Sequence, residues 1–328
     1  MQYFSLISRI LGVPYCLAMK LRNLLYSCGI RKSYESPIPV ICVGNITTGG
    51  TGKTPMTVLV TSLLGRLGRN PAILTRGYMA TGGFSDEAVL LKQLTGAEVI
   101  VNPDRAAGAV EAESRGADTV VMDDGFQHLR LSRNLDIVLV DASRPFGNGA
   151  CLPAGRLREP LSGLRRAGII VITRSDQVDP DTLEKLEKTI AVLAPGIPIV
   201  TAVHRPEFVT GPEGGRLPLE FLEDRKSFLF CGLGNADSFF KTAESAGAKI
   251  AGTLKFPDHA DYDPRAVSRL NNVAGETDAE VLFTTQKDAI KLDTSSLNLP
   301  LFQLAVKMEI TRGEIQFEEA VKTALEIG

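Results

Sequence analysis

The stretch of sequence that decides the fold is Gly44-Asn45-Ile46-Thr47-Thr48-Gly49-Gly50-Thr51-Gly52-Lys53-Thr54. It follows an apolar run, 40–43, that predicts a buried strand, and it precedes apolar residues at helical spacing over 56–67. Glycines allow backbone N–H groups to turn toward an anion, and a following helix adds unpaired N–H groups and the positive end of its dipole. A strand, a glycine-rich turn, Gly-Lys-Thr and a helix, in this order, predict a phosphate-binding P-loop.

Each position of this turn has an expected role toward ATP. Lys53 is expected to reach the β- and γ-phosphates, and the Thr54 hydroxyl is expected to hold Mg²⁺. The strict P-loop pattern places glycine where this chain has Thr47, and the chain has glycines inside the loop instead. The residues expected to surround the nucleotide are Thr47, Thr48, Gly49, Gly50, Thr51, Gly52, Lys53 and Thr54.

The composition is that of a globular protein. The chain has 328 residues, of which 44% are hydrophobic and 23% charged, and its net charge is −2. This length allows two domains, and the near-neutral charge gives no reason to expect nucleic acid as a partner. The five cysteines are scattered without CxxC spacing, which indicates a reducing compartment and no structural zinc.

Apolar runs alternate with helical patterns along the whole chain. Continuous apolar strands alternating with helices predict a P-loop NTPase-like parallel sheet with helices on both faces, followed by a second, smaller α/β domain. We expect residues 1–206 to form the nucleotide-binding domain and residues 207–328 the smaller one, joined by a short hairpin or linker at 211–215. The strands are predicted at 40–43, 72–74, 99–101, 119–122, 136–140, 168–173, 198–203, 227–231, 249–256, 281–284 and 301–306.

The N-terminal segment, 2–28, is apolar and carries only positive charges, among them Arg9, Lys20 and Arg22. Because Arg9 and Pro14 interrupt it, an uncharged run long enough to span a bilayer is absent from the sequence. Two interpretations stay open. The segment is either an amphipathic helix that lies in an anionic membrane interface or a helix that packs on its own domain.

Two carboxylates end one predicted strand. The apolar run 119–122 is followed by Asp123 and Asp124, which is the form of a Walker B element, in which an aspartate contacts Mg²⁺ directly or through water. Ligands of parallel sheets lie at the carboxyl ends of the strands, so we expect this pair to lie beside Thr54.

Four other stretches leave alternatives open. The spacing of Ser85-Asp86-Glu87 favours a helix N-cap with acids in the first turn over a general base or metal ligand. The arginine-rich loop 144–166 either binds a phosphoryl group or is a solvated basic face. Asp258-His259 is either an acid–base pair or structural, and Thr285-Gln286-Lys287-Asp288 either reaches phosphate or caps a helix.

Taken together, these residues resemble the tetraacyldisaccharide 4′-kinases, the lipid A 4′-kinases of Gram-negative bacteria. The resemblance extends over nearly the whole chain, and the family shares the missing first glycine of the P-loop. The motifs that carry it are Val43-Gly44-Asn45 with the P-loop, Thr75-Arg76-Gly77-Tyr78, Ser85-Asp86-Glu87, Asp104-Arg105, Asp123-Asp124-Gly125-Phe126-Gln127-His128, Phe146-Gly147-Asn148-Gly149, Leu152-Pro153-Ala154-Gly155-Arg156-Leu157-Arg158-Glu159-Pro160, Phe256-Pro257-Asp258-His259 and Thr284-Thr285-Gln286-Lys287-Asp288-Ala289.

The resemblance implies ATP-dependent phosphorylation of the 4′-hydroxyl of a tetraacylated glucosamine disaccharide 1-phosphate. It also implies a peripheral, monotopic position on the cytoplasmic face of the bacterial inner membrane. The expected partners are therefore the lipid A precursor and an anionic membrane surface, with no nucleic acid and no obligate protein partner. An acceptor that lives in the bilayer favours the interfacial interpretation of the N-terminal helix.

The resemblance also assigns roles to single residues. The family's catalytic carboxylate corresponds to Asp86 and its partner histidine to His259, which reverses the interpretation from spacing alone. Arg105 and Arg158 are expected near the phosphates, with Arg158 and Lys53 in the catalytic set. The expected ligands of Mg²⁺ are Thr54, Glu87, Asp123 and Asp124.

Two alternative functions remain at this stage. One is a P-loop kinase of a soluble small metabolite, for which lipid or detergent would make no difference. The other is a nucleotide-driven switch NTPase, for which Thr173-Arg174-Ser175-Asp176 is a weak guanine-recognition signal. A switch would prefer guanine nucleotides and depend on a protein partner, whereas a kinase needs an acceptor hydroxyl.

Overall fold

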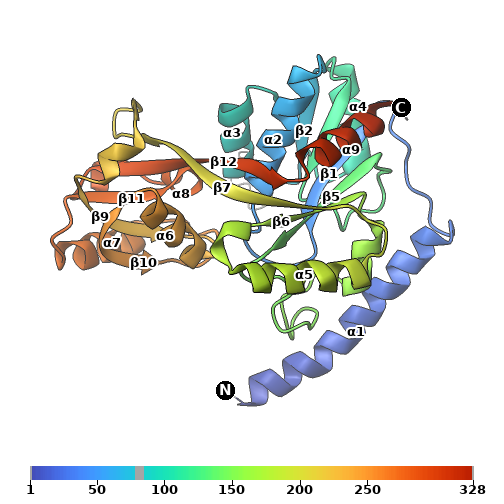
Figure 1. Cartoon of the computed structure of the whole chain (residues 1–328), viewed down its shortest axis with the longest axis horizontal. Coiled ribbons are helices and arrows are strands. Elements are labelled where there is room, and N and C mark those ends of the chain that lie inside the picture. The colour runs from blue at the N-terminus through green and yellow to red at the C-terminus, as the bar shows by residue number, and fades with distance from the viewer. Residues whose placement is uncertain (1, 78–84, 327–328) are drawn as a thin grey trace. The chain divides into compact units, whose positions relative to one another are not determined.

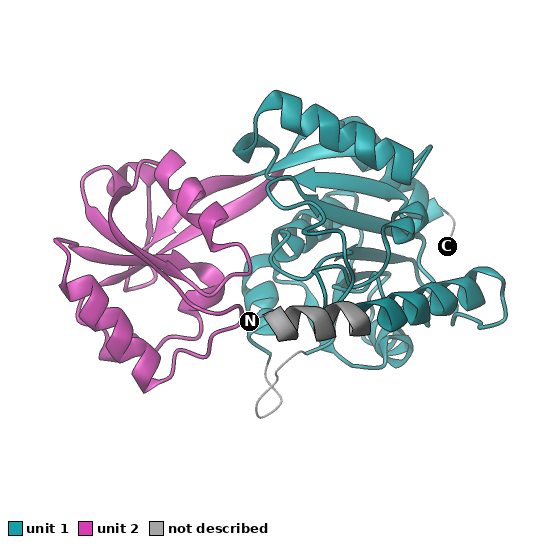
Figure 2. Cartoon of the chain, turned by 90° about the horizontal axis from the view of Figure 1, so that it is seen from below, with its two compact units in different colours: residues 1–203, 310–328 teal, residues 204–309 magenta. Residues whose placement is uncertain are grey.

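The structure is a computed structural model that describes residues 2–77 and 85–326. The chain forms two compact units, coloured separately in Figure 2. Unit 1 contains residues 1–203 and 310–328, and unit 2 contains residues 204–309. Two long strands, β7 (Ile199–Thr210) and β12 (Leu301–Arg312), run from one unit to the other in opposite directions.

In unit 1 the strands pair in parallel, in the order β7-β6-β5-β1-β4-β2-β3. The P-loop strand β1 thus lies between β5 and β4, the strand that ends in Asp123. The remaining strands of this unit are β1 (Val40–Asn45), β2 (Pro71–Thr75), β3 (Glu98–Val101), β4 (Thr119–Asp123), β5 (Leu135–Asp141) and β6 (Ile169–Thr173).

Helices cover both faces of this sheet, and α5 and α9 lie on opposite sides of β5 and β6 in Figure 1. Alternate strand residues such as Val40 and Cys42 face a core shared with α4 and α5, because successive side chains of a strand point to opposite faces. The helices of the unit are α1 (Gln2–Ser27), α2 (Lys53–Arg66), α3 (Asp86–Thr95), α4 (Arg105–Ser114), α5 (Pro180–Leu193) and α9 (Glu314–Glu326), with 3₁₀ turns at Leu161–Arg166 and Ser175–Gln177.

Unit 2 has its own sheet order, β10-β9-β11-β12-β7, and its own apolar clusters on the two sides. The predicted turn at 211–215 is a hairpin, in which β8 pairs antiparallel with the end of β7. The elements of this unit are β8 (Arg216–Leu217), β9 (Lys226–Cys231), α6 (Ala236–Ser245), β10 (Lys249–Lys255), α7 (Pro264–Gly275), β11 (Val281–Thr285) and α8 (Gln286–Ala289), with 3₁₀ turns at Leu219–Leu222 and Thr294–Ser296.

The limits of the units differ from the predicted domains 1–206 and 207–328 at the C-terminal end. β12 returns the chain to unit 1, where α9 packs on β1 and β5 with Phe317 and Val321 buried. An amphipathic pattern at 316–326 predicts a helix but carries no information about which sheet receives its apolar face. The second unit, 204–309, is therefore an insertion that begins within β7 and ends within β12 rather than a C-terminal domain.

Helix α1 continues through Pro14 and has two different faces. Tyr15 and Cys16 pack against the core of unit 1, so part of the packing interpretation holds. The other face exposes an apolar stripe at helical spacing, Val13, Leu17, Leu21 and Leu24, each 56–61% exposed. None of the described helices combines the length with the apolar character that crossing a bilayer requires.

Candidate active site

The P-loop is formed by residues 46–52 between β1 and α2. Gly49 and Gly52 have φ angles of 108° and 94°, a backbone conformation that favours glycine and that begins the helix at Lys53. Inside the loop, Asn45 Nδ2 donates to Thr51 Oγ1 over 2.8 Å, and Thr173 Oγ1 donates to the Thr51 carbonyl over 2.9 Å. These bonds fix the loop from β1 and from β6, as an anion-binding turn requires.

The loop after β5 packs directly on the P-loop. Thr48 N donates to the Arg156 carbonyl over 2.7 Å, and Arg156 Nη2 donates back to the Thr48 carbonyl over 3.1 Å. Arg158 N donates to the Ile46 carbonyl over 2.8 Å. The arginine-rich loop therefore packs on the P-loop at Arg156 and Arg158, which do not form a solvated basic face, and a role of this loop in binding phosphate stays a prediction.

Asp124, Lys53 and Arg158 form a charged triad beside the P-loop. Asp124 Oδ1 accepts a hydrogen bond from Arg158 Nη1 over 2.7 Å, and Lys53 Nζ lies 3.7 Å from the same oxygen. Burial alone would raise the pKa of Asp124, but the two cations outweigh burial and hold its pKa below the ordinary value. Both cations are thus held at the P-loop with a single carboxylate between them.

Asp123 is the buried member of the pair, and its surroundings disfavour its negative charge. Its carboxylate is 3% exposed and accepts one hydrogen bond, from Thr57 Oγ1 over 2.9 Å. Burial, together with the neighbouring carboxylates Glu87 and Asp124, raises its pKa to about 6. The negative charge at this point therefore has less compensation from the protein than that of Asp124.

A divalent cation fits this arrangement. Mg²⁺ prefers oxygen ligands and is commonly held by one or two carboxylates together with substrate phosphates, while it keeps several waters. Asp123 and Asp124 at the end of β4, with Thr54 at the start of α2, supply such donors. The described residues contain no cluster of three or more acidic, histidine or cysteine side chains already gathered as a metal site.

Arg105, the first residue of α4, contacts the main chain at the end of β4. The side chain is 2% exposed, and its guanidinium donates to the Asn102 carbonyl over 3.0 Å and to the Asp123 carbonyl over 3.4 Å. Burial lowers its pKa to about 10. The structure thus brings Arg105 to the main chain of the acidic strand end, where its positive charge counters Asp123 and Asp124.

His128 follows the acidic pair on the same loop. Its pKa is lowered to about 4, chiefly by burial and then by the positive charges of Arg105, Arg130 and Arg133. The Nε2 atom is buried without a hydrogen-bond partner among the described residues. The histidine is therefore neutral at pH 7, and an unused ring nitrogen lies close to the site.

Asp86 and Glu87 begin α3. Asp86 is exposed, and Glu87 is close enough to Asp123 to raise the pKa of that carboxylate. Ser85 occupies the N-cap position, but its hydroxyl makes no capping bond. Tyr78, the last residue of the motif Thr75-Arg76-Gly77-Tyr78, and Met79 after it lie outside the described residues.

His259 lies in unit 2, after the carboxyl end of β10. Its backbone φ of 61° is unusual for a residue with a side chain, and its N–H donates to the Gly232 carbonyl over 3.2 Å. Nε2 lies 4.0 Å from Asp258 Oδ1. Asp86 belongs to unit 1 and His259 to unit 2, so their pairing stays a prediction.

The second ambiguous motif of unit 2 is structural in part. Thr285 caps α8, since its hydroxyl accepts from Asp288 N over 3.1 Å. Asp288 is 1% exposed and accepts from Gly232 N, Tyr262 Oη and Thr285 Oγ1 over 3.0, 2.8 and 2.7 Å. The carboxylate thus joins the ends of β9 and β11 to the loop that carries His259.

Gln127 and Glu159 of unit 1 belong to two of the family motifs, but the sequence assigns neither of them a role. Gln127 Nε2 donates to the Asn45 carbonyl over 2.8 Å and to Glu159 Oε1 over 2.9 Å. Glu159 is fully buried. The available signal was that Glu159 is the single acid in a loop with five arginines, because a lone carboxylate there is expected to pair with one of them.

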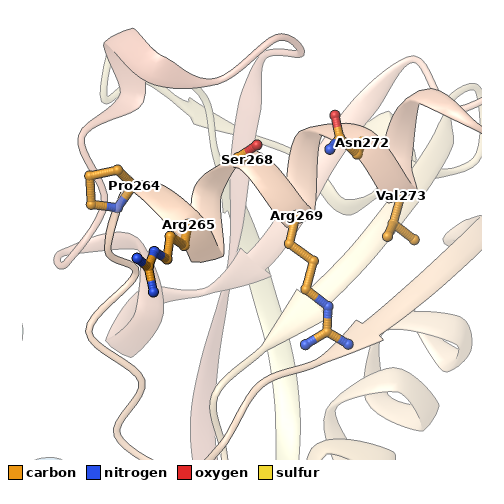
Figure 3. A pocket seen from close by; sticks show the side chains of 6 residues that line it. All are labelled: Pro264, Arg265, Ser268, Arg269, Asn272 and Val273. Carbon is orange, nitrogen blue, oxygen red and sulfur yellow. The ribbon is translucent and has the colours of Figure 1, made fainter.

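A hollow of about 590 Å³ lies along α7 in unit 2, whereas the P-loop belongs to unit 1. Figure 3 shows its lining, in which Arg265 and Arg269 extend from successive turns of the helix. The groups described above for the P-loop site are absent from this lining. The geometry of the P-loop, rather than the volume of this hollow, therefore defines the candidate active site.

Comparison with known families decides what this site belongs to. The profile of the family described as "LpxK: Tetraacyldisaccharide-1-P 4'-kinase" matches residues 4–326. The chain belongs to the tetraacyldisaccharide-1-P 4′-kinase family. The predicted family is thereby confirmed.

Curated relatives of this family match along almost the whole chain. A protein of Syntrophus aciditrophicus named tetraacyldisaccharide 4′-kinase is 37% identical, with 99% of this chain and 94% of the relative covered. One of the same name from Syntrophotalea carbinolica is 39% identical over 93% of this chain and 88% of the relative. The family assignment therefore applies to both units.

A solved structure of the family agrees with the fold. The LpxK from Aquifex aeolicus, described as an "apo" form in complex with ATP, has a TM-score of 0.75 and 27% identity, with 99% of this chain and all of that chain covered. The predicted fold class, a mostly parallel sheet with helices on both faces, is confirmed.

Proposed function

We infer that this chain is an ATP-dependent kinase that transfers the γ-phosphoryl group to the 4′-hydroxyl of a tetraacylated disaccharide 1-phosphate, the lipid A precursor. The observation that carries the inference is the P-loop with Lys53, Arg158 and Asp124 in a chain that matches this kinase family from residue 4 to residue 326. The soluble-metabolite kinase and the switch NTPase have no comparable support.

The P-loop amides and Lys53 bind the phosphates, and Arg158 neutralises charge that develops on the transferred group. Lys53 and Arg158 are already held on Asp124, so binding the triphosphate requires little reorganisation of them. Arg105 stabilises the acidic strand end from below. Mg²⁺, held by Asp123, Asp124 and Thr54 with Glu87 nearby, would shield the charge of the phosphates when bound.

Asp86 is proposed as the general base. It is exposed at the first turn of α3, in the helix whose Glu87 acts electrostatically on Asp123, so its carboxylate is accessible to an acceptor at the same strand ends. It takes the proton of the 4′-hydroxyl as the oxygen attacks the γ-phosphorus. His259, supplied by unit 2, is proposed to orient and tune Asp86.

The exposed stripe of α1 supports a membrane-bound position for the enzyme. Four apolar side chains on one face, with Lys20 exposed on the same helix and Arg31 and Lys32 exposed after it, suit an anionic bilayer surface. Because the acceptor carries acyl chains, a peripheral position on the cytoplasmic face of the inner membrane would bring kinase and substrate to one surface.

The decisive experiment is incubation with γ-labelled ATP, Mg²⁺ and the tetraacyldisaccharide 1-phosphate in mixed micelles, with label counted on the lipid. Transfer to the lipid is expected for the full chain and is expected to be lost in Lys53→Ala. Label that appears only as free phosphate, or transfer that survives in Lys53→Ala at the wild-type rate, would contradict the proposal. A soluble sugar acceptor phosphorylated equally well would instead favour the metabolite kinase.

A further inference from the structure

Glu159 is a buried carboxylate at which three segments of unit 1 meet. It is 0% exposed and accepts from Arg166 Nη1 and Nη2 over 2.8 and 3.0 Å, from Gln127 Nε2 over 2.9 Å and from Asn23 Nδ2 over 2.8 Å. Burial would raise its pKa, but Arg166, Gln127 and Asn23 outweigh burial and hold the pKa of Glu159 below its ordinary value. One of these donors, Asn23, belongs to helix α1.

Helix α1 contacts the loop 151–159 at several points along its length. The Tyr15 hydroxyl donates to the Arg158 carbonyl over 2.8 Å. A Cβ at Gly12 would lie 2.8 Å from the Ala154 Cβ, so the helix and the loop are in close contact there. The amide of Asn23 is oriented by Arg22, whose guanidinium donates to Oδ1 over 2.9 Å and leaves Nδ2 for Glu159.

Two routes lead from these contacts to the nucleotide site. On the first, Glu159 holds Gln127, which donates to the Asn45 carbonyl, and Asn45 in turn donates to Thr51 of the P-loop. On the second, Tyr15 holds the main chain of Arg158, whose guanidinium pairs with Asp124 next to Lys53. Every link is a direct hydrogen bond or ion pair within unit 1.

We propose that helix α1 is a working part of the nucleotide site, in which Tyr15 and Asn23 act as positioning residues for Arg158 and the P-loop. Affinity for ATP then depends on the inner face of α1 even where neither lipid nor membrane is present. The outer face, with its exposed apolar stripe, takes no part in nucleotide binding on this proposal. This inference rests on the P-loop assignment in the proposed function but not on the membrane role of α1.

The expected loss of affinity for the nucleotide follows from the kind of hydrogen bond that each variant removes. A hydrogen bond to a charged group contributes more than one between neutral groups, and only part of the loss reaches Thr51, which lies three hydrogen bonds beyond Glu159. Asn23→Leu is therefore expected to weaken binding of Mg²⁺ with a non-hydrolysable ATP analogue about tenfold. Tyr15→Phe removes one hydroxyl and is expected to weaken it about threefold.

The test measures the affinity of the full chain for Mg²⁺ and the non-hydrolysable ATP analogue by calorimetry, in detergent micelles without lipid substrate. Leu17→Gln on the outer face is one matched control and Asn271→Leu, on α7 of unit 2, is the other. Both controls are expected to keep wild-type affinity, while Leu17→Gln loses binding to anionic phosphatidylglycerol vesicles. Steady-state kinetics of the inner-face variants should show a raised KM for ATP with a smaller change in kcat.

Unchanged affinity in a folded Asn23→Leu protein would overturn the proposal, and so would an equal loss in Leu17→Gln. If Asn23→Leu does not fold, Tyr15→Phe decides by the same criterion. Lys53→Ala separates the two levels of the argument. Wild-type affinity in that variant would refute the P-loop assignment itself, whereas loss there with unchanged Asn23→Leu refutes only the coupling through α1.

Discussion

The carboxyl ends of the strands differ between the two units in how their buried carboxylates are satisfied. Asp123, at the end of β4 in unit 1, has one hydrogen bond from a side chain, and burial, followed by the charges of Glu87 and Asp124, raises its pKa to about 6. Asp288, after β11 in unit 2, accepts three hydrogen bonds from Gly232, Tyr262 and Thr285. The same residue type is therefore satisfied in one unit and left under repulsion in the other, in both cases near the carboxyl end of a strand.

This difference teaches where to look for a ligand. A buried carboxylate that the protein satisfies fully is part of the framework, whereas one with repulsive neighbours has room for a cation to compensate it. Asp141, at the end of β5, belongs to the first class, since Arg174 pairs with it over 2.5 Å. This criterion favours the segment around Asp123 and the P-loop as the proposed ligand site of unit 1, whereas the Asp288 network of unit 2 joins a loop to the strand ends.

The largest expected effect is on catalysis. Asp86→Asn removes the proposed base from an exposed position, so turnover should fall by about 10²–10⁴ while stability and ATP affinity change little. Initial rates with labelled ATP and the lipid acceptor, together with thermal unfolding, measure both. Full turnover in Asp86→Asn would exclude it as the base and would leave the exposed start of α3 without a chemical role.

The second effect is on the framework. Asp288→Asn replaces a carboxylate that accepts from three donors with an amide that also carries donors, so unfolding free energy should fall by about 2–3 kcal/mol. Urea denaturation measures it, with Tyr262→Phe as a milder companion expected to lose about 1 kcal/mol. Stability equal to wild type in Asp288→Asn would contradict the division into framework and ligand-site carboxylates.

The third expected effect is a gain in stability, on substitution of Asp123. Because the pKa of Asp123 is raised above its ordinary 3.8 in the folded state, the folded protein holds that proton more tightly, and stability contributed by this group is lost as pH rises from about 4 through 6. Asp123→Asn should therefore stabilise the nucleotide-free protein by about 1–2 kcal/mol at pH 7.5 and by little at pH 4.5. Activity should fall in the same variant.

Thermal unfolding of both aspartate variants in the same buffers at these two pH values compares the two units directly. Destabilisation by Asp123→Asn at pH 7.5 would mean that Asp123 is part of the framework, as Asp288 is. With Mg²⁺ and the ATP analogue present at pH 7.5, the wild type should instead be more stable than Asp123→Asn, because a bound cation favours the ionised carboxylate of the wild type.

Most of the strands and the strand–loop–helix order of the P-loop could be predicted from the sequence. The reason is that a run of adjacent apolar residues identifies a buried parallel strand. In the same way, glycines followed by Gly-Lys-Thr identify a P-loop, because its turn requires them. Asp123 and Asp124 were predictable in the same way, because the residue that ends a strand in such a sheet is at the ligand edge. Their electrostatic difference was not, since it depends on Glu87, Lys53 and Arg158 arriving from three other segments.

The sequence by itself determined a P-loop, the carboxylates beside it, an α/β fold and a family. Only the tertiary structure decided that 310–328 return to the first unit, that Arg158 is held on Asp124, and that α1 bonds to Arg158 and Glu159 through Tyr15 and Asn23. The physical reason is distance along the chain. Asn23 and Glu159 are 136 positions apart, and such a contact follows from where the loops of a sheet converge rather than from any local pattern.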